Sequence, residues 1–332
     1  MTRVLHVEPN SPDPLACEQA GRLLREGNLV AFPTETVYGL GANALDDEAV
    51  ASIYRAKGRP TFNPTIVHVA DVEMARVLAE TWPAVADSLA ASFWPGPLTL
   101  VVRHAGRVSA VATAGGATVA LRMPRHLVAL RVIKSAGVPV AAPSANRSGS
   151  ISPTTAEHVV RSLGGRIDLI LDSGPTDLGI ESTVLDLSGG TPSILRPGHV
   201  TKREIERIIG PIADRIDADG GPLRSPGRLQ RHYAPNAATE CHNRMSLIVR
   251  LEGLAKLGAR VGVLTCCGRI PQEYSCTLQK DLTMEAVRYA ASLYASLQDM
   301  DAAGVDHILI ELPPTGDSWD AIHDRLRRAA AV

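Results

Sequence analysis

The chain has 332 residues, of which 45% are hydrophobic and 21% charged, and its formal net charge at pH 7 is −1. These values are typical of a globular protein with a sizeable core, and the length allows two domains of about 100–200 residues each. The near-zero net charge excludes whole-molecule basicity as a means of binding nucleic acid, although a local basic patch stays open. No apolar run approaches the roughly 20 residues of a membrane-spanning helix.

The N-terminus and the cysteines predict a cytoplasmic protein with reduced thiols. The first residues lack the apolar stretch of a signal peptide. Cys17, Cys241, Cys266, Cys267 and Cys276 form neither a disulfide framework nor a zinc-binding spacing. An odd count with one adjacent pair is typical of a reducing compartment.

The first 210 residues predict many short strands with helices at irregular intervals. The second helix is expected to begin after Asp46 and to end at Gly58. Aspartate is a preferred N-cap residue, and glycine is the preferred residue at a helix C-terminus. Helices are expected at 13–26, 46–58, 127–135 and 202–209. Strands are expected at 29–32, 65–69, 98–102, 118–121, 138–141, 169–171, 182–185 and 193–195. This pattern favours an α/β fold of the α+β or mixed-sheet type over a regular βαβ series.

A change in composition and hydrophobic periodicity near residue 210 predicts a domain boundary. Glycine and proline punctuate the stretch to about residue 236, which has little periodicity and is interpreted as a linker. The following block predicts helices at 247–257, 284–300 and 319–330 with strands at 260–264 and 307–310, a small α/β domain. The predicted domains are therefore 1–210 and 239–332, joined by a linker at 211–238.

Common nucleotide-binding and hydrolase motifs do not account for this sequence. No P-loop motif occurs. Residues 39–44 fit Gly-x-Gly-x-x-Ala, but six residues separate the expected strand from Gly39, where the dinucleotide motif has a tight turn. We interpret this match as a coincidence. The absence of Gly-x-Ser-x-Gly and His-Glu-x-x-His removes support for serine hydrolase and zinc protease functions.

A pair of cations follows the second predicted helix. Lys57 and Arg59 lie at a helix C-terminus, which attracts cations for purely electrostatic reasons. They also lead through Pro60 and Asn63 into a strand that ends at His68. A fixed cation pair suits the recognition of polyphosphate, so we expect both side chains at a solvent-lined cleft.

Other polar residues also cluster at predicted strand ends. Arg122 closes an apolar strand and needs a planar anionic partner, which is either a structural carboxylate or a ligand carboxylate. Ser144 and Asn146 follow another strand and offer neutral hydrogen bonds. Further polar segments lie at 33–41, 179–184 and 196–198. Each segment alone has a structural explanation as a capped turn, but five together predict a binding site.

These segments resemble the YrdC-like domain. The resemblance rests on Phe32–Leu40, Lys57–Pro60, Pro143–Asn146, Glu181–Val184 and Arg196–Gly198. Residues 225–227 and 232–235 resemble the linker, and 293–297 and 321–330 the tail, of the long, two-domain form of the threonylcarbamoyl-AMP synthase family. Two positions depart from that pattern: Arg228, where the linker usually has a smaller or apolar residue, and Asp324, where the tail usually has asparagine.

The resemblance implies a YrdC-like open twisted mixed sheet with a large cleft, plus a small C-terminal Rossmann-like domain. The implied enzyme is a nucleotidyltransferase that makes L-threonylcarbamoyl-AMP and pyrophosphate from L-threonine, bicarbonate and ATP. Mg²⁺ would accompany the phosphates, with no metal site made by the protein alone. A partner transferase would carry the threonylcarbamoyl group to tRNA, so contact with tRNA would be indirect.

The resemblance also assigns roles to individual residues. Lys57 and Arg59 would be the catalytic cations that stabilise phosphoryl charge. ATP would contact Arg59, Asn63, Thr118, Ser144, Asn146, Ser152, Arg196 and Tyr233. L-threonine would be held by Thr36, His68, Arg122, Ala142 (through its backbone) and Ser182.

Two alternatives are weaker. A protein that binds double-stranded RNA or the ribosome could use a cationic cleft, but the net charge of −1 is against it. The carbamoyl transferase of hydrogenase maturation also contains a YrdC-like domain. That family carries zinc-finger cysteines and an acylphosphatase-like segment, which this chain lacks.

Overall fold

The computed structural model describes residues 1–213 and 233–331, and they form two compact units. The described part of the first unit comprises residues 1–148, 153–177 and 181–213. The second comprises 233–331 together with two short segments, 149–152 and 178–180. Most of the predicted linker, including 225–227, Arg228 and His232, lies outside the described residues. The domain boundaries at 210 and 239 stay a prediction.

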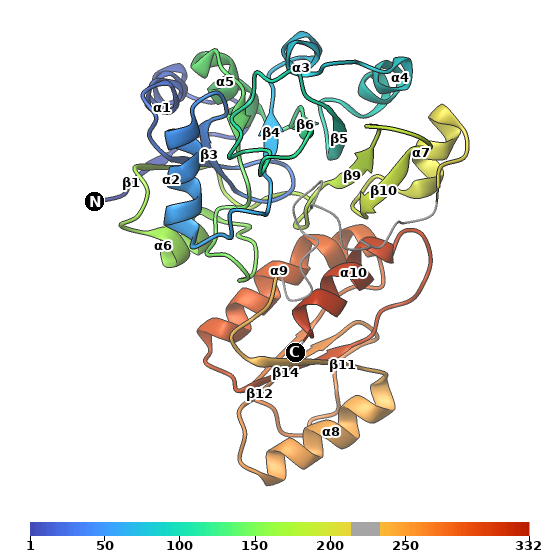
Figure 1. Ribbon diagram of the computed structural model, residues 1–332. Helices are drawn as coiled ribbons and strands as arrows, with labels where there is room; N and C mark the ends of the chain where they lie inside the picture. The colour runs from blue at the N-terminus through green and yellow to red at the C-terminus, as the bar shows by residue number, and fades with distance from the viewer. Residues whose placement is uncertain (214–232, 332) are drawn as a thin grey trace. The chain divides into compact units, whose positions relative to one another are not determined.

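A ten-stranded mixed sheet organises the first unit, with the order β1-β8-β2-β3-β7-β4-β6-β5-β9-β10 (Figure 1). Its strands are β1 (Arg3–His6), β2 (Val30–Phe32), β3 (Gly39–Asn43), β4 (Ile66–His68), β5 (Leu98–Arg103), β6 (Thr118–Arg122), β7 (Val140–Ala141), β8 (Leu169–Asp172), β9 (Thr183–Asp186) and β10 (Ser193–Arg196). Parallel pairs such as β4 with β6 alternate with antiparallel pairs such as β5 with β6. The predicted mixed-sheet fold is confirmed.

Helices cover this sheet and pack against its buried apolar residues. They are α1 (Pro14–Arg25), α2 (Asp47–Lys57), α3 (Val72–Leu78), α4 (Ala84–Phe93), α5 (Leu127–Ala136), α6 (Ala156–Leu163) and α7 (Lys202–Ile209). α1 and α5 pack side by side, and their apolar residues share one core with those of β2 and β8 (Figure 1). α2 is placed by local chemistry: the Asp46 carboxylate accepts hydrogen bonds from two N–H groups of its first turn, and Gly58 ends it with a left-handed φ of 60°. The predicted caps are confirmed.

The segment that fits Gly-x-Gly-x-x-Ala is strand β3, not a turn between strand and helix. β3 pairs antiparallel with β2 on one side and with β7 on the other. A Cβ atom on Gly41 would lie 2.7 Å from the Phe32 ring and 2.9 Å from Val140, so glycine here permits close packing. The interpretation of this motif as a coincidence is confirmed. No strand was predicted at these residues, because glycine-rich strands lack the β-branched signal.

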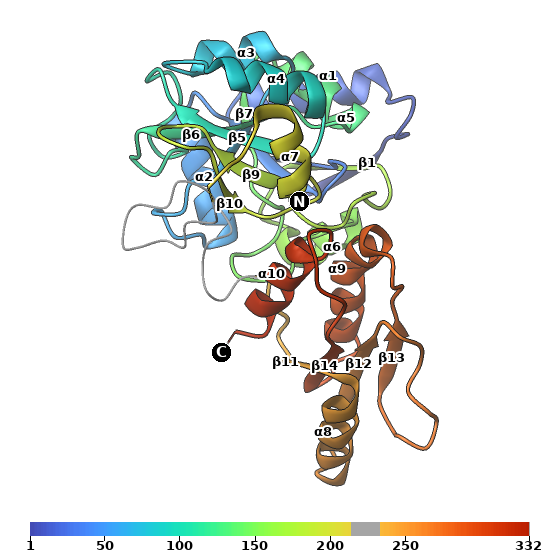
Figure 2. The same cartoon turned by 90° about the vertical axis from the view of Figure 1, so that its right-hand side faces the viewer.

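The second unit is a three-layer α/β domain whose four strands are all parallel. Its sheet has the order β11-β14-β12-β13, with β11 (Ala238–His242), β12 (Val261–Thr265), β13 (Leu278–Asp281) and β14 (His307–Glu311). Helix α8 (Arg244–Lys256) covers one face, and α9 (Ala286–Ala302) and α10 (Asp320–Ala329) cover the other (Figures 1 and 2). The predicted small α/β domain is confirmed. β11 and β13 escaped prediction because they carry polar, partly exposed residues.

A buried charge cluster closes the last helix of the second unit. The Asp324 carboxylate accepts hydrogen bonds from Arg325 at 2.9 Å and from Arg328 at 3.0 and 3.2 Å. All three residues are buried. One carboxylate therefore accepts hydrogen bonds from two guanidinium groups, at the position where the resemblance predicts asparagine.

Within residues 1–213 and 233–331, no helix combines the length and apolar character that a bilayer crossing requires.

Candidate functional site

The strand order of the first sheet brings the predicted threonine-binding residues onto neighbouring strands. Their elements follow one another as β3, β7, β4, β6, β5 and β9. Within this run, His68 at the end of β4 pairs in register with Arg122 at the end of β6. The Ala142 amide donates to the Ile66 carbonyl at 2.9 Å. Residues that are far apart in sequence thus form one continuous row, and all of this row is buried.

Arg122 forms a buried ion pair with Glu35. Its Nη2 donates to Glu35 Oε1 at 2.8 Å, and its Nε donates to the Gly96 carbonyl. The two side chains are only 4% and 1% exposed. Burial alone would raise the pKa of Glu35, but the charge and hydrogen bond of Arg122 outweigh burial and lower it. The structural carboxylate that remained an open alternative for Arg122 is therefore present, and it fixes the plane of the guanidinium group.

One nitrogen of Arg122 remains available. Among the residues that the structure describes, Nη1 has no hydrogen-bond acceptor. A guanidinium group that is held in place and still has a donor suits the recognition of a ligand carboxylate.

His68 is a buried, neutral histidine beside Arg122. Burial, followed by the positive charge of Arg122, lowers the pKa of His68 to about 3. Its ring packs edge-on against Phe32, with ring centroids 6.5 Å apart. Its Nδ1 atom has no partner among the described residues. A buried polar atom without a partner is costly, and a bound ligand would remove that cost.

Thr36 lies in the turn between β2 and β3. Its hydroxyl group uses its hydrogen within the turn, so its oxygen can still accept a hydrogen bond. The Thr34 hydroxyl donates to the Val37 carbonyl at 2.6 Å. The 2.8 Å contact between the Thr34 and Thr36 hydroxyls must then use the Thr36 hydrogen. The lone pairs of the Thr36 oxygen remain available to a ligand donor.

Ser182, a predicted threonine-binding residue, contacts a predicted ATP-binding residue. Its hydroxyl lies 2.8 Å from the Thr99 hydroxyl and accepts a hydrogen bond from Arg196 at 3.1 Å. Arg196 also donates to the Ser182 carbonyl through Nε and Nη2. A residue predicted to bind ATP thus contacts a residue predicted to bind threonine.

Lys57 is buried, which corrects the expectation of a solvent-lined side chain. It is 3% exposed, and its ammonium group donates to the carbonyls of Ser144 and Asn146. Burial, with the positive charge of Arg59 as a second cause, lowers its pKa well below the ordinary value. Sequence reasoning missed this role because a helix C-terminus usually lies near solvent. Lys57 holds the loop after β7 against the end of α2.

Arg59 is also buried and lies beside Asn63. It donates to the Asn63 carbonyl at 3.1 Å and the Pro64 carbonyl at 2.6 Å, and it lies 5.8 Å from the Tyr54 ring centroid. The Asn63 side chain is fully buried, yet neither its oxygen nor its nitrogen has a partner among the described residues. A buried amide with both polar atoms unpaired calls for a partner such as a ligand, an ion or water, so this loop is a candidate ligand site.

Three predicted ATP contacts come from other elements. Thr118 is at the start of β6, four residues before Arg122. Ser152 and Tyr233 belong to the second unit. There Tyr233 is buried with a positive φ of 61°, stacked on Tyr294 at 5.8 Å between ring centroids and covered by Arg325 at 5.3 Å.

Sequence reasoning assigned no role to Glu35, Thr34 or Thr99. All three are buried and bond directly to predicted site residues. The sequence could have predicted a role for Glu35, because this carboxylate lies in a polar turn and a buried arginine needs an anionic partner. No such signal existed for Thr99, which lies inside an apolar strand.

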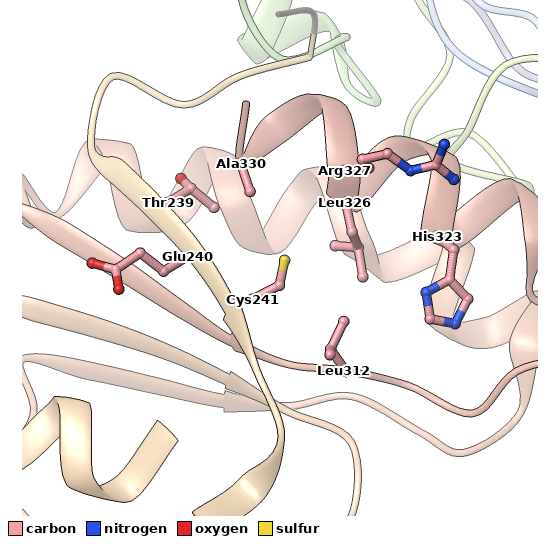
Figure 3. A pocket seen from close by; sticks show the side chains of 8 residues that line it. All are labelled: Thr239, Glu240, Cys241, Leu312, His323, Leu326, Arg327 and Ala330. Atoms are coloured by element: carbon pink, nitrogen blue, oxygen red, sulfur yellow. The ribbon is translucent and has the colours of Figure 1, made fainter. Parts of the chain in front are cut away.

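The second unit also has a pocket of about 630 Å³ between β11 and α10 (Figure 3). Glu240, His323 and Arg327 supply its charged and polar rim, and Leu312 and Leu326 supply apolar walls. None of the predicted site residues lines it.

Comparisons with known proteins agree with the fold. A family model described as "Telomere recombination" matches residues 22–198, and one described as "Threonylcarbamoyl-AMP synthase, C-terminal domain" matches 200–331. Threonylcarbamoyl-AMP synthase of Bacillus subtilis is 46% identical over 94% of this chain and 92% of its own length. That of Pyrococcus abyssi is 44% identical over 94% and 93%.

A solved structure resembles the whole chain. The crystal structure of P. abyssi Sua5 complexed with L-threonine has a TM-score of 0.93 and 41% sequence identity, and the match covers 99% of this chain and 98% of that one. Escherichia coli YciO shares only the fold of the catalytic domain, at 24% identity and a TM-score of 0.54 over 60% of this chain. With both family models matched in order and relatives similar over nearly their full length, the chain belongs to the threonylcarbamoyl-AMP synthase family.

Proposed function

We propose that this chain condenses L-threonine, bicarbonate and ATP into L-threonylcarbamoyl-AMP and pyrophosphate, for the threonylcarbamoyl modification of adenosine in tRNA. Family membership supports the activity, and a relative crystallised with L-threonine supports the substrate. The observation in this chain that carries the proposal is the buried row of Thr36, His68, Arg122 and Ser182, which lie on or next to strands of one sheet. Its unpaired polar atoms suit a small zwitterionic, hydroxylated ligand.

In this proposal each end of threonine has its own partners. Arg122, oriented by Glu35, binds the carboxylate through its remaining Nη1 donor. Thr36 and Ser182 supply hydroxyl groups for the amine and the side-chain hydroxyl. His68 stays neutral, so it adds a hydrogen bond without a second positive charge beside Arg122.

The reaction itself needs charge stabilisation more than a covalent nucleophile. The carboxylate of N-carboxythreonine forms a bond to the α-phosphorus of ATP, and the bond from that phosphorus to the bridging oxygen breaks, so pyrophosphate leaves with the electron pair. Negative charge gathers on phosphoryl oxygens in this step. Arg59 supplies a permanent positive charge, and a phosphate beside Lys57 would favour its ammonium form, which burial disfavours.

Mg²⁺ fits this site as an ion carried on the nucleotide. The cluster consists of two cations and the neutral Asn63 amide, whose Oδ1 has no partner among the described residues. Such a set offers one neutral oxygen and no carboxylate, so the phosphates would provide most ligands. Bound there, the ion would neutralise phosphate charge.

Several finer assignments belong to the same proposal. The enzyme is a nucleotidyltransferase that acts in the cytoplasm and passes its product to a tRNA threonylcarbamoyl transferase. Asn63, Thr118, Ser144, Asn146, Ser152, Arg196 and Tyr233 contact ATP, by resemblance. Tyr233→Phe would separate the hydroxyl of this residue from its stacking on Tyr294, and a raised KM for ATP would support a nucleotide contact.

The decisive test is pyrophosphate release with threonine, serine or valine, each with and without bicarbonate. Valine lacks the hydroxyl, and a site built to bond a hydroxyl rejects such an analogue by as much as about 10⁴. Serine lacks only a methyl group, a loss of about 1–3 kcal/mol, and should react weakly. Equal rates with valine and threonine would overturn the pocket assignment. Release that ignores bicarbonate would indicate an aminoacyl-adenylate enzyme instead.

A further inference from the structure

Three sulfur atoms meet at the carboxyl edge of the sheet in the second unit. Cys266 and Cys267 directly follow β12, and Met284 precedes α9 in the connection after β13. All four strands are parallel, so their carboxyl ends share one edge. Open parallel α/β sheets bind ligands outside this edge, where the connections diverge.

The spacing of the sulfur atoms suits a shared metal ion. Cys266 Sγ lies 3.8 Å from Cys267 Sγ, and Cys267 Sγ lies 3.5 Å from Met284 Sδ. With a metal–sulfur bond of about 2.3 Å, two sulfur ligands of one ion lie at most about 4.6 Å apart. Both distances already satisfy this limit. Cys267 and Met284 are exposed, so an ion can enter from solvent.

The loop that carries the cysteines is held by the protein. Glu311, the last residue of β14, accepts hydrogen bonds from the amides of Cys266 at 2.9 Å and Cys267 at 3.3 Å. Gly268 has a left-handed φ of 91°, and its amide donates to Asp281 at the end of β13. The position of the thiols therefore comes from two neighbouring strands.

The charges around the sulfur atoms and the type of ligand indicate which class of metal ion would bind. A carboxylate oxygen of Glu311 lies within 4.8 Å of both thiol sulfurs, which alone would suggest zinc. Arg244, however, donates to both Glu311 oxygens, at 3.3 and 3.2 Å. The Glu311 carboxylate, the only hard ligand of this group, is therefore engaged by Arg244, which also places a positive charge near the sulfur atoms. Thiol and thioether ligands prefer soft ions such as Cu(I).

We propose that Cys266, Cys267 and Met284 form a binding site for a soft, thiophilic monovalent metal ion of the Cu(I) class. Binding replaces the thiol protons, which pass to solvent, so affinity rises with pH. The site is independent of the proposed synthase activity.

The test is a titration of the full chain with Cu(I), under reducing and oxygen-free conditions, against a chromophoric Cu(I) chelator. We expect one equivalent to be bound. Cys267→Ser should weaken Cu(I) binding by at least roughly 100-fold. Replacing a residue that only hydrogen-bonds to a metal ligand already lowers metal affinity by about 10–100-fold. Met284→Leu should weaken binding by roughly 10-fold. Both residues are exposed, so both variants should fold.

Cys276→Ser is the matched control, because Cys276 is a partly exposed thiol of the same unit outside the cluster. It should bind like the wild type. X-ray absorption of the loaded protein should show sulfur ligands at about 2.3 Å. Failure of the wild type to compete with the chelator would overturn the proposal, and so would equal affinity in Cys267→Ser. Tighter binding of Zn(II) than of Cu(I) would contradict the class of ion.

Discussion

The two units bury charged residues in different ways. In the first, Lys57, Arg59 and Arg122 are buried within a few strands of one another, and their contacts include backbone carbonyls as well as a carboxylate. In the second, Asp324 is bonded directly to Arg325 and Arg328, so charge meets opposite charge. The ammonium group of Lys57 thus faces neutral carbonyl oxygens, whereas the arginines of the second unit face a carboxylate.

This difference favours the first unit as the place of a binding site. A buried charge is expensive unless it is paired, so a buried ammonium group beside neutral carbonyls favours a ligand that brings negative charge. Asn63 and His68, with buried atoms that lack partners among the described residues, lie in the same region of the first unit. A polyanion and a small zwitterion would supply the missing partners. The charges at the end of α10 need no ligand to explain them.

Removing Glu35 should have the largest effect on stability. Glu35→Ala leaves Arg122 buried without its counter-ion and should lower the free energy of unfolding by about 3–5 kcal/mol. Urea denaturation measures this change. The matched control is Glu80→Ala, since Glu80 and Arg103 form an ion pair of the same 2.8 Å length that is about half exposed. That variant should lose at most about 1 kcal/mol. Equal losses would show that burial does not distinguish the two pairs.

Removing either cation of the phosphate site should reduce catalysis. Arg59→Ala and Lys57→Ala should each lower the turnover number for pyrophosphate release by roughly 10²–10³. Lys57→Ala should also destabilise the fold, because its ammonium group holds two loop carbonyls. Arg55→Ala is the control, being an exposed cation of the same helix paired with Glu48. Wild-type turnover in Arg59→Ala would end the assignment of this cluster to phosphate.

Replacing Asp324 should affect stability without affecting chemistry. Asp324→Asn, which restores the residue of the family pattern, keeps one acceptor for two arginines and should cost about 1–3 kcal/mol in unfolding free energy. The rate of pyrophosphate release per folded molecule should not change. Thermal denaturation and an activity assay on the same samples measure both. A change in rate without a change in stability would assign this cluster to the site.

Near neutral pH the smallest expected effect is that of His68, whose titration matters for stability only as the pH falls. His68 has a pKa of about 3 when folded, against about 6.5 unfolded. The unfolded state therefore binds more protons between these values, and stability falls as pH drops from 6.5 toward 3. His68→Gln should flatten this dependence by up to about 1.4 kcal/mol per pH unit. Urea titrations at pH 4, 5, 6 and 7 measure the slope. An unchanged slope would mean that His68 is already charged in the fold.

Local chemistry explains what could be predicted of the fold. The caps at Asp46 and Gly58 act within a few residues, and α7 lies where its periodicity predicts. Strands β1, β3, β11 and β13 were missed, since glycine, polar or partly exposed residues give no alternating apolar pattern. The candidate site was predicted as a set of residue types at strand ends, and its membership stays a proposal.

The sequence by itself determined the family, the mixed sheet and the residues that a site could use, because motifs and periodicity are local properties. Only the tertiary structure decided what each residue touches. Arg122 meets Glu35 across 87 positions, and the amide of Cys266 meets Glu311 across 45. Such partners are chosen by strand order and register, which depend on how all strands pack together. Burial is decided in the same way, and it changes Lys57 from an exposed cation into a buried support of the loop after β7.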